Sequence, residues 1–286
     1  MTDASSGGSP ALRRLEVAAA LRRHRKAARL STAEVLARVG FSASKLSRIE
    51  TGNRTVQVSD LEVLCGLYGV DGHEQQRLTQ LVDESRQPSV WTERETTNPA
   101  QAEYLELEEA ASAIDDYKSS MVTALLQTSA YMRAFFRALS PHLPISEIEQ
   151  QVSDRNYRQQ KIMGRTEKEP LRFILDEAAL WRQVGGPQVL RAQLAHLADL
   201  TWSPAVSIFV IPFNRGAHIG VNSLFTILTF EESVRDRVYV DGLRGPEYLA
   251  EAKDVERYRG HFEDLLGKAL DRTSSRDLIL DIKKRL

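Results

Sequence analysis

Two short helical segments joined through a glycine, STAEVLARVGFSASKLSRIETG at residues 31–52, constrain the fold more than any other part of the chain. Ser31 is a good helix N-cap, Glu34 follows at the spacing of a capping box, and the first glycine ends the segment. The next helix starts behind Ser42 and ends at Gly52. Such a pair with a tight turn is typical of a helix-turn-helix, whose second helix enters the major groove of DNA.

The second helix of this pair has two different faces. At about 100° per residue, its inward arc consists of Leu46, Ile49 and Glu50. Its outward arc is small and polar and consists of Ala43, Ser44, Lys45, Ser47 and Arg48. Side chains near the amino end of a recognition helix reach base edges, so Arg48 fits a bidentate contact to guanine and Lys45 a guanine or phosphate contact. The serines fit hydroxyl contacts.

Phosphate contacts are expected around the same helix. Backbone N–H groups near Thr32 and Ala43, at the starts of the two helices, are placed to meet phosphates with the help of the helix dipole. The expected DNA-binding residues are Thr32, Ser42, Ala43, Ser44, Lys45, Arg48, Arg54 and Thr55. The alternative is a packed helix with a solvated, charged outer side.

The charge distribution favours a polyanionic partner. The formal net charge is −1, but residues 11–58 hold eleven Lys or Arg against three acidic residues, a balance of +8, so the remainder carries −9. A basic first region and an acidic body indicate that only the first region binds nucleic acid. On charge alone, a solvated cationic helix face is the alternative.

Length and composition set the class of protein. A chain of 286 residues, 42% hydrophobic and 27% charged, is expected to form two globular domains. No apolar run approaches the roughly 20 residues that cross a bilayer, and the amino terminus lacks the regions of a signal peptide, so we expect a cytoplasmic protein with no membrane contact. The single cysteine, Cys65, excludes an internal disulfide and is expected to fill a helix core.

The expected organisation has four parts. Residues 1–10 form a disordered tail, residues 11–86 a five-helix DNA-binding domain, residues 87–100 a linker, and residues 101–286 a larger domain. The five helices are expected to start at about Leu12, Ser31, Ser42, Ser59 or Asp60, and Gly72.

The larger domain mixes helical and strand patterns. Helices are expected at residues 104–120, 125–139, 145–163, 177–185, 187–200, 246–270 and 275–286. Strands are expected at residues 171–176, 205–213, 223–230 and 237–243. The expected fold is therefore mainly α, with a five-helix helix-turn-helix domain followed by a larger α+β domain with a small sheet.

The segments LRRHRKAARLS, VGFSASKLSRIETG and LEVLCGLYGV resemble the helix-turn-helix domains of the Cro and cI repressors, also called the xenobiotic-response-element family. The resemblance covers residues 15–70. In that family an arginine of the first helix pairs with the glutamate that closes the recognition helix. The resemblance therefore implies an ion pair between Arg25 and Glu50 that locks the two helices. The alternative for Glu50 is a solvated acid at a helix end.

Three residues depart from the pattern of that family. Thr32 stands where a DNA-contacting glutamine usually begins the second helix, and Leu36 stands where a small alanine usually lets the two helices touch. Arg29 replaces the glycine that usually ends the first helix, at about 1 kcal/mol of strain if the left-handed conformation is kept. The fold expectation survives all three.

The larger domain also has a resemblance. Segments beginning YLELEEAASAIDDYK, DEAALWRQVGG, VSIFVIPFNRGAHIG and YVDGLRGPEYL are similar to the domain that follows such a DNA-binding module in a large group of actinobacterial regulators. Many of these are encoded beside a small partner protein and are described as antitoxin-like. The resemblance implies a second domain that receives a signal, and it supplies no ligand.

No catalytic motif is present. The sequence has no Gly-rich phosphate loop, GxSxG, HExxH or CxxC, so we expect neither an enzyme nor a cofactor. Glu106, Glu108 and Glu109 form an acidic run that suits a metal, but we interpret them as the wet side of an amphipathic helix.

One loop is a candidate for a ligand or partner site. NRGAHIG, residues 214–220, places His218 between two apolar strands, although it also fits a plain connecting turn. The residues that would line a pocket with it, or serve as ordinary core and rim, are Asp176, Glu177, Trp181, Phe213 and Tyr239.

These observations predict a sequence-specific transcription regulator. We expect a homodimer on an inverted-repeat operator in double-stranded DNA, because one recognition helix sees too few base pairs for genomic specificity. The second domain is expected to dimerise and to receive a small-molecule effector or a small partner protein. The alternative is an antitoxin-like protein that neutralises a neighbour-encoded protein and binds DNA for autoregulation. A third hypothesis is an enzyme that carries a helix-turn-helix.

Overall fold

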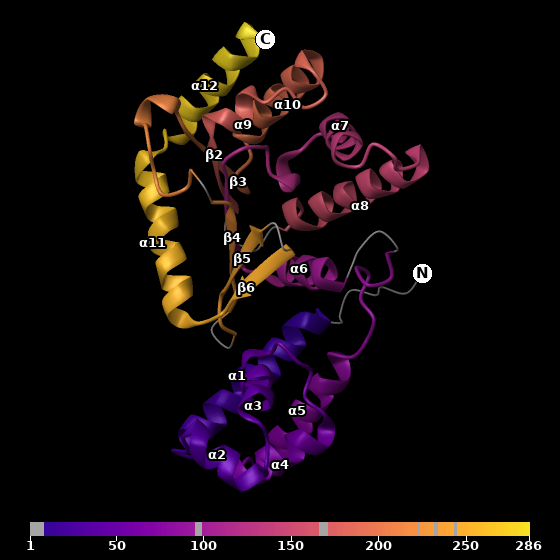
Figure 1. Ribbon diagram of the computed structural model, residues 1–286, viewed down its shortest axis with the longest axis vertical. Helices are drawn as coiled ribbons and strands as arrows, with labels where there is room; N and C mark the ends of the chain where they lie inside the picture. Colours follow the sequence, from indigo (N-terminus) through magenta and orange to yellow (C-terminus); the bar gives the residue numbers. More distant parts are fainter. Residues whose placement is uncertain (1–8, 95–98, 166–170, 222, 232–233, 243–244) are drawn as a thin grey trace. The chain divides into compact units, whose positions relative to one another are not determined.

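The structure is a computed structural model that describes residues 9–94, 99–165, 171–221, 223–231, 234–242 and 245–286 (Figure 1). The tail expected at residues 1–10 falls mostly outside the described residues, and Pro10 already begins the first helix. The chain divides into two units. The first comprises Met1–Ala110 and Phe230–Arg235, and the second comprises Ala111–Thr229 and Asp236–Leu286.

The first unit is built from helices. They are α1 (Pro10–Ala27), α2 (Thr32–Val39), α3 (Ala43–Thr51), α4 (Val58–Tyr68), α5 (Gly72–Glu84) and α6 (Pro99–Ala110). The expected linker at residues 87–100 lies inside this unit, since Trp91 is buried and its Nε1 donates a 2.9 Å hydrogen bond to Glu109 on α6. Part of that linker, residues 95–98, lies outside the described residues.

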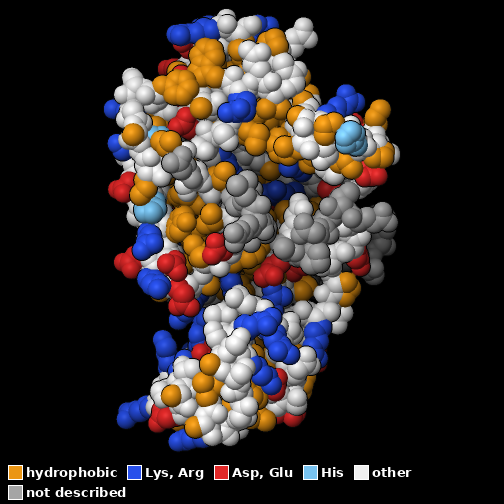
Figure 2. Space-filling view, viewed as in Figure 1, with side chains coloured by type: hydrophobic (Ala, Val, Ile, Leu, Met, Phe, Trp, Pro, Cys, Tyr) orange, Lys and Arg blue, Asp and Glu red, His pale blue; other side chains and the backbone are white. Residues whose placement is uncertain are grey.

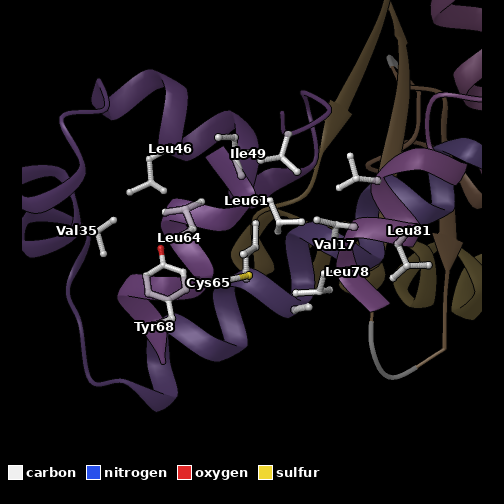
Figure 3. Close-up of a cluster of buried hydrophobic side chains, with 14 residues drawn as sticks. Val17, Val35, Leu46, Ile49, Leu61, Leu64, Cys65, Tyr68, Leu78 and Leu81 are labelled. Carbon is white, nitrogen blue, oxygen red and sulfur yellow. The ribbon is translucent and has the colours of Figure 1, made fainter. Parts of the chain in front are cut away.

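Helices α1, α2, α3, α4 and α5 share one hydrophobic core. Its buried side chains point into one cluster (Figure 3) and include Val17, Val35, Leu46, Ile49, Leu61, Leu64, Cys65, Tyr68, Leu78 and Leu81. Cys65 fills this core as expected, and burial raises the pKa of its thiol to about 11. A thiol that stays protonated at neutral pH is inert, so Cys65 is a packing residue.

The fourth helix is capped differently from the prediction. It begins at Val58 behind Gln57, which makes no side-chain capping bond, and the expected caps Ser59 and Asp60 lie in its first turn. The carboxylate of Asp60 is used elsewhere, because it accepts a 2.7 Å hydrogen bond from Lys45. The cap prediction was therefore wrong.

The second unit is a mixed sheet with helices on it. Its helices are α7 (Ser129–Leu139), α8 (Ile145–Met163), α9 (Glu177–Trp181), α10 (Pro187–Leu200), α11 (Ala252–Lys268) and α12 (Arg272–Arg285), with short 3-10 turns η1 (Ala124–Leu126) and η2 (Phe213–Arg215). Its strands are β1 (Ala113–Lys118), β2 (Leu171–Asp176), β3 (Val206–Ile211), β4 (Phe225–Thr229), β5 (Arg237–Gly242) and β6 (Gly245–Leu249).

The six strands lie in the order β3-β2-β1-β4-β5-β6. β1, β2 and β3 are parallel to one another, whereas β4, β5 and β6 continue the sheet in antiparallel fashion. Helix α11 runs along one face (Figure 1), where Val255, Phe262 and Leu265 pack on a row that includes Tyr117 and Phe225. The expected fold class is confirmed.

Two strands were missed from the sequence. The pattern at residues 104–120 favours one long helix, but α6 ends at Ala110 and β1 follows it. Asp115 and Asp116 are unusual in a strand, and both are paired. Asp115 receives a bidentate contact from Arg172 at 2.6 and 2.7 Å, and Asp116 lies 2.8 Å from Lys118. Ion pairing in the folded sheet thus overrides the low strand propensity of aspartate.

The second missed strand lies at the other edge of the sheet. The helical pattern expected from residue 246 begins only with α11, because β6 first pairs with β5. No helix in the described part of the chain is long and apolar enough to cross a membrane.

Candidate nucleic-acid interface

The two helices of the motif are set by local capping. The Ser31 hydroxyl accepts from the backbone N–H of Glu34 at 3.2 Å, and the Glu34 carboxylate accepts from the N–H of Ser31 at 2.8 Å. The Ser42 hydroxyl accepts from the N–H of Lys45 at 3.1 Å, which starts α3. α2 and α3 end at Gly40 and Gly52 in the left-handed region, with φ of 68° and 73°. The sequence therefore defines both helices and their turn locally.

An ion pair ties α3 to α1. Arg25 donates to both oxygens of the Glu50 carboxylate, at 2.6 and 2.9 Å, and also to the carbonyl of Leu30 at 3.0 Å. Glu50 is only 7% exposed. The hydrogen bond to Glu50 raises the pKa of Arg25 further, so the guanidinium stays charged. This is the contact that the family resemblance implies.

Two more arginines of α1 hold the same end of α3. Arg14 Nε donates to the carbonyl of Gly52 at 2.7 Å, and Arg22 donates to the carbonyl of Glu50. The last carbonyls of a helix have no partner within the helix and carry its negative dipole end, so cations are well placed there. We call Arg14, Arg22 and Arg25 the arginine clamp. Sequence reasoning missed its first two members, although their spacing puts all three on one helical face.

The outward face of α3 is free to meet a partner. Ser42, Ala43, Ser44 and Arg48 are exposed. Lys45 is half-buried, because its ammonium group pairs with Asp60 and lies 3.8 Å from the centre of the Phe41 ring. Lys45 therefore has to leave an intramolecular partner before it contacts DNA.

The remaining candidates lie around α3. Thr32 is exposed in the first turn of α2, and Arg54 is exposed and Thr55 half-buried in the segment after α3. Among the described residues, Arg48 and Arg54 make no salt bridge. The exposed Arg38 of α2, which is not among the expected DNA-binding residues, makes none either.

The charge balance of the first region overstates what is available to DNA. Much of the excess lies in the arginine clamp and in the Lys45–Asp60 pair. On the face seen in Figure 2, Lys and Arg side chains stand out at the edge of the part formed by α1 to α5. The exposed cations, rather than the total, define the electrostatic surface.

The departures from the family pattern are accommodated locally. Arg29 keeps the left-handed conformation of the usual glycine, with φ of 56°, and is the one non-glycine residue with positive φ in the described chain. Leu36 packs partly buried against the core cluster.

The second unit brings most of the ligand candidates together. Asp176 Oδ2 lies 3.0 Å from His218 Nε2. Glu177 accepts from Trp181 Nε1 at 2.9 Å and from the backbone N–H of Phe213 at 2.8 Å. These contacts lie where β2 and β3 end.

Tyr239 does not join this group. It pairs in register with Thr226 on β4 and lies near Tyr248, with ring centroids 5.5 Å apart. Phe225, next to Thr226, shares the α11 face with Tyr117, so Tyr239 points to the opposite face. Its inclusion in the pocket was wrong, because the strand pleat separates it from the loop.

The acidic run of α6 is not a wet helix face. Glu106 and Glu108 are buried. Glu106 accepts from the backbone N–H of Ala11 at 2.8 Å and from Ser89 at 2.6 Å, and Glu108 accepts from Tyr104 at 2.7 Å. A carboxylate at the start of α1 satisfies an otherwise unpaired helix N–H. No group of three His, Cys, Asp or Glu side chains suited to a metal occurs among the residues that the structure describes.

Comparison with protein families assigns both parts of the chain. Residues 16–78 match a Helix-turn-helix domain, and residues 101–281, more than half of the chain, match the Domain of unknown function (DUF5753). The chain belongs to the DUF5753 family. No curated protein and no solved structure matches the chain. The DUF5753 match begins within α6, and the helix-turn-helix match spans the arginine clamp except Arg14. The first unit of this DUF5753 protein therefore carries a DNA-binding motif of the kind found in regulators.

Proposed function

We propose that the protein is a sequence-specific transcription regulator of the Cro and cI type. The observation that carries the proposal is the outward face of α3, where Ser44 and Arg48 are exposed while the arginine clamp fixes the helix behind them. A fixed helix presents its side chains without first losing conformational freedom, which favours specific contact with base edges. The chain acts as a binder of DNA and not as an enzyme.

The proposal includes a homodimer. A recognition helix reads about four base pairs, which is too few to select an operator in a genome. A two-fold dimer on an inverted repeat doubles the number of base pairs that are read. The second unit supplies the dimer contact and receives the signal. Apolar side chains for such a contact are present, since Trp202 is 72% exposed.

An antitoxin-like role is the second candidate. Leu139 and Ile145, which flank the turn between α7 and α8, are 65% and 66% exposed. Exposed apolar side chains close together in the chain favour docking of a protein. In this role a small neighbour-encoded protein binds the second unit, and DNA binding regulates the chain's own synthesis. Leu139→Asp then releases a co-purified small protein and leaves DNA binding unchanged.

The test of the DNA proposal is a genome-wide pull-down at about 150 mM salt, where non-specific phosphate contacts are weak. Wild type is compared with a Ser44→Ala, Arg48→Ala double variant and with Arg77→Ala, which removes an exposed arginine of α5. Wild type and Arg77→Ala are expected to enrich one inverted repeat, and the double variant to lose it. Equal, salt-sensitive enrichment by all three proteins contradicts the proposal.

A further inference from the structure

The carboxyl ends of three parallel strands meet at one edge of the sheet in the second unit. β1, β2 and β3 end at Lys118, Asp176 and Ile211, and the chain from Pro212 to Val221 runs past this edge. Ligands of sheets with parallel strands commonly bind outside the carboxyl ends. We call Tyr117, Asp176 and His218 the strand-edge cluster.

Asp176 fixes the orientation and the tautomer of His218. Its Oδ1 accepts from the backbone N–H of Ala178 at 2.8 Å, and its Oδ2 lies 3.0 Å from His218 Nε2. A carboxylate only accepts hydrogen bonds, so Nε2 carries the proton. Nδ1, on the other side of the ring, then presents a lone pair in the neutral imidazole. The His218 side chain is 2% exposed, and Nδ1 has no hydrogen-bond partner among the described residues.

Tyr117 places a second unpaired group beside this pair. It is fully buried, its ring meets that of His218 edge-on with centroids 6.3 Å apart, and its hydroxyl has no hydrogen-bond partner in the described chain. Burial and then the charge of Asp176 raise the pKa of Tyr117, so its hydroxyl remains a proton donor at neutral pH.

The loop closes directly over the Tyr117 hydroxyl. A Cβ at Gly220 would lie 2.4 Å from Tyr117 Cζ and 2.5 Å from its hydroxyl oxygen, so only glycine allows this approach. The same loop region exposes Phe213, Ile219 and Val221 to solvent, each by about half. The buried polar pair and three exposed apolar side chains therefore belong to the same strand-edge region of the chain.

The two acidic side chains that follow β2 and line this edge are already satisfied. Both oxygens of Glu177 accept hydrogen bonds, and so do both of Asp176. Within the strand-edge cluster, the groups without a partner among the described residues are a donor, Tyr117 O–H, and, in the neutral imidazole, an acceptor, His218 Nδ1. Buried polar groups of native proteins are normally paired, so an unpaired complementary couple points to an occupant.

We infer that Tyr117 and His218 bind the neutral hydroxyl or carboxamide group of a small molecule whose apolar body contacts Phe213, Ile219 and Val221. A hydroxyl or a carboxamide accepts from Tyr117 and donates to Nδ1 at the same time. The carboxylate of Asp176 disfavours an anion, and an ammonium group accepts nothing from Tyr117. The inference rests on the proposed function only in identifying this molecule with the signal received by the second unit.

The test uses the full chain with ¹⁵N-labelled histidine and four probes that share one phenyl ring: benzamide, benzyl alcohol, benzoate and benzylamine. A His218→Gln variant identifies the His218 resonances. Benzamide and benzyl alcohol are expected to shift the Nδ1 resonance saturably, and the two charged probes are not. The measurement contains no DNA, so it can fail while the DNA proposal stands, and the reverse.

Tyr117→Phe separates a binding role from a structural one. Removing an unpaired buried hydroxyl is expected to raise the melting temperature of the free protein by about 2–4 °C. The same change is expected to weaken binding of benzamide by about 2- to 10-fold through loss of one hydrogen bond. Tyr131→Phe, the same change at a fully buried tyrosine of α7, is the control and leaves the affinity unchanged.

Three outcomes overturn the inference. One is the absence of any saturable shift of the His218 resonances by the neutral probes. Another is a Tyr117→Phe variant that binds as wild type does. The third is a lower melting temperature for free Tyr117→Phe, which shows that the hydroxyl is a structural group bridged by water.

Discussion

The carboxyl end of α3 and the carboxyl edge of strands β1 to β3 differ in whether their buried polar groups have hydrogen-bond partners. At α3, the Glu50 carboxylate and the carbonyls of Glu50 and Gly52 receive hydrogen bonds from the arginine clamp. At the strand edge, Tyr117 O–H and His218 Nδ1 receive none from the described residues. A fully paired site is rigid before its partner arrives, whereas an unpaired site gains stability when a ligand supplies the missing bonds. The first suits a DNA-reading helix and the second a signal receiver.

The largest expected effect comes from breaking the clamp at its buried acid. Glu50→Ala leaves the Arg25 charge buried and unpaired, and we expect the free energy of unfolding of the first unit to fall by about 3–5 kcal/mol. Arg25→Ala, Glu50→Ala together should lose less than the two single losses added, because neither charge is then stranded. Denaturant unfolding measures both variants.

Glu62→Ala, at an exposed acid of α4, is the control and should change stability by less than about 0.5 kcal/mol. A similarly small change for Glu50→Ala would mean that the clamp does not hold α3, and the comparison would lose its first half.

The stability of the first unit is also expected to depend on pH, through Glu74. Hydrogen bonds from Arg77, and then from His24, lower the pKa of Glu74 to about 2 from 4.5. A lowered pKa stabilises the folded state above the unfolded value, so the contribution is complete above about pH 4.5 and fades as pH falls toward 2. Because the partner Arg77 is exposed and solvent screens the pair, we expect the loss of stability to be only about 1 kcal/mol. Hydrogen exchange of α1 and α5 amides should show this loss in wild type and not in Glu74→Gln.

Glu74 joins α1 to α5 and touches none of the expected DNA contacts, so Glu74→Gln also separates stability from recognition. Its operator affinity at neutral pH should equal that of wild type. If protection of α1 and α5 is the same at pH 3 and pH 6 in wild type, the Glu74 contacts contribute nothing to stability.

The next effect is on DNA affinity alone. Arg48 is exposed and makes no salt bridge within the described chain, so Arg48→Ala should weaken operator binding by about 1–3 kcal/mol and leave the free energy of unfolding unchanged. Lys45→Ala should weaken binding less, because Lys45 first has to leave Asp60. Titrations at several salt concentrations distinguish the two roles. An equal loss on all sequences, with a smaller salt slope, would make Arg48 a phosphate contact.

The sequence predicted the first half of the comparison better than the second for a physical reason. Ser31, Glu34, Ser42 and Gly52 act on neighbours within a few residues, so their roles follow from spacing alone. The clamp is less local. A count of charges includes Arg22 among the cations available to DNA. In the structure, however, Arg22 donates a hydrogen bond to the carbonyl of Glu50, 28 residues away.

The strand edge depends on tertiary pairing. β1 looked helical because Asp115 and Asp116 resemble a wet helix face, and their partners Arg172 and Lys118 become evident only in the sheet. Missing β1 also hid Tyr117, whose place beside His218 needs the parallel pairing of β1 with β2. Asp176 and His218 are candidates from the sequence because they follow expected strands, and loops at strand ends often carry sites.

The smallest expected effect tests how much backbone strain at one residue costs the stability of the first unit. Arg29 holds a left-handed conformation with φ of 56° just after α1, where glycine is free of the Cβ penalty. Arg29→Gly relieves that strain but gives the unfolded chain more freedom, so the net gain in stability should be at most about 1 kcal/mol. Arg38→Gly, in the last turn of α2, is the opposite control and should destabilise by up to about the same amount, since glycine has a low helix propensity. If Arg29→Gly destabilises as Arg38→Gly does, the Arg29 side chain stabilises the α1–α2 connection more than its backbone strain opposes it, and the departure from the family pattern is a gain for this fold.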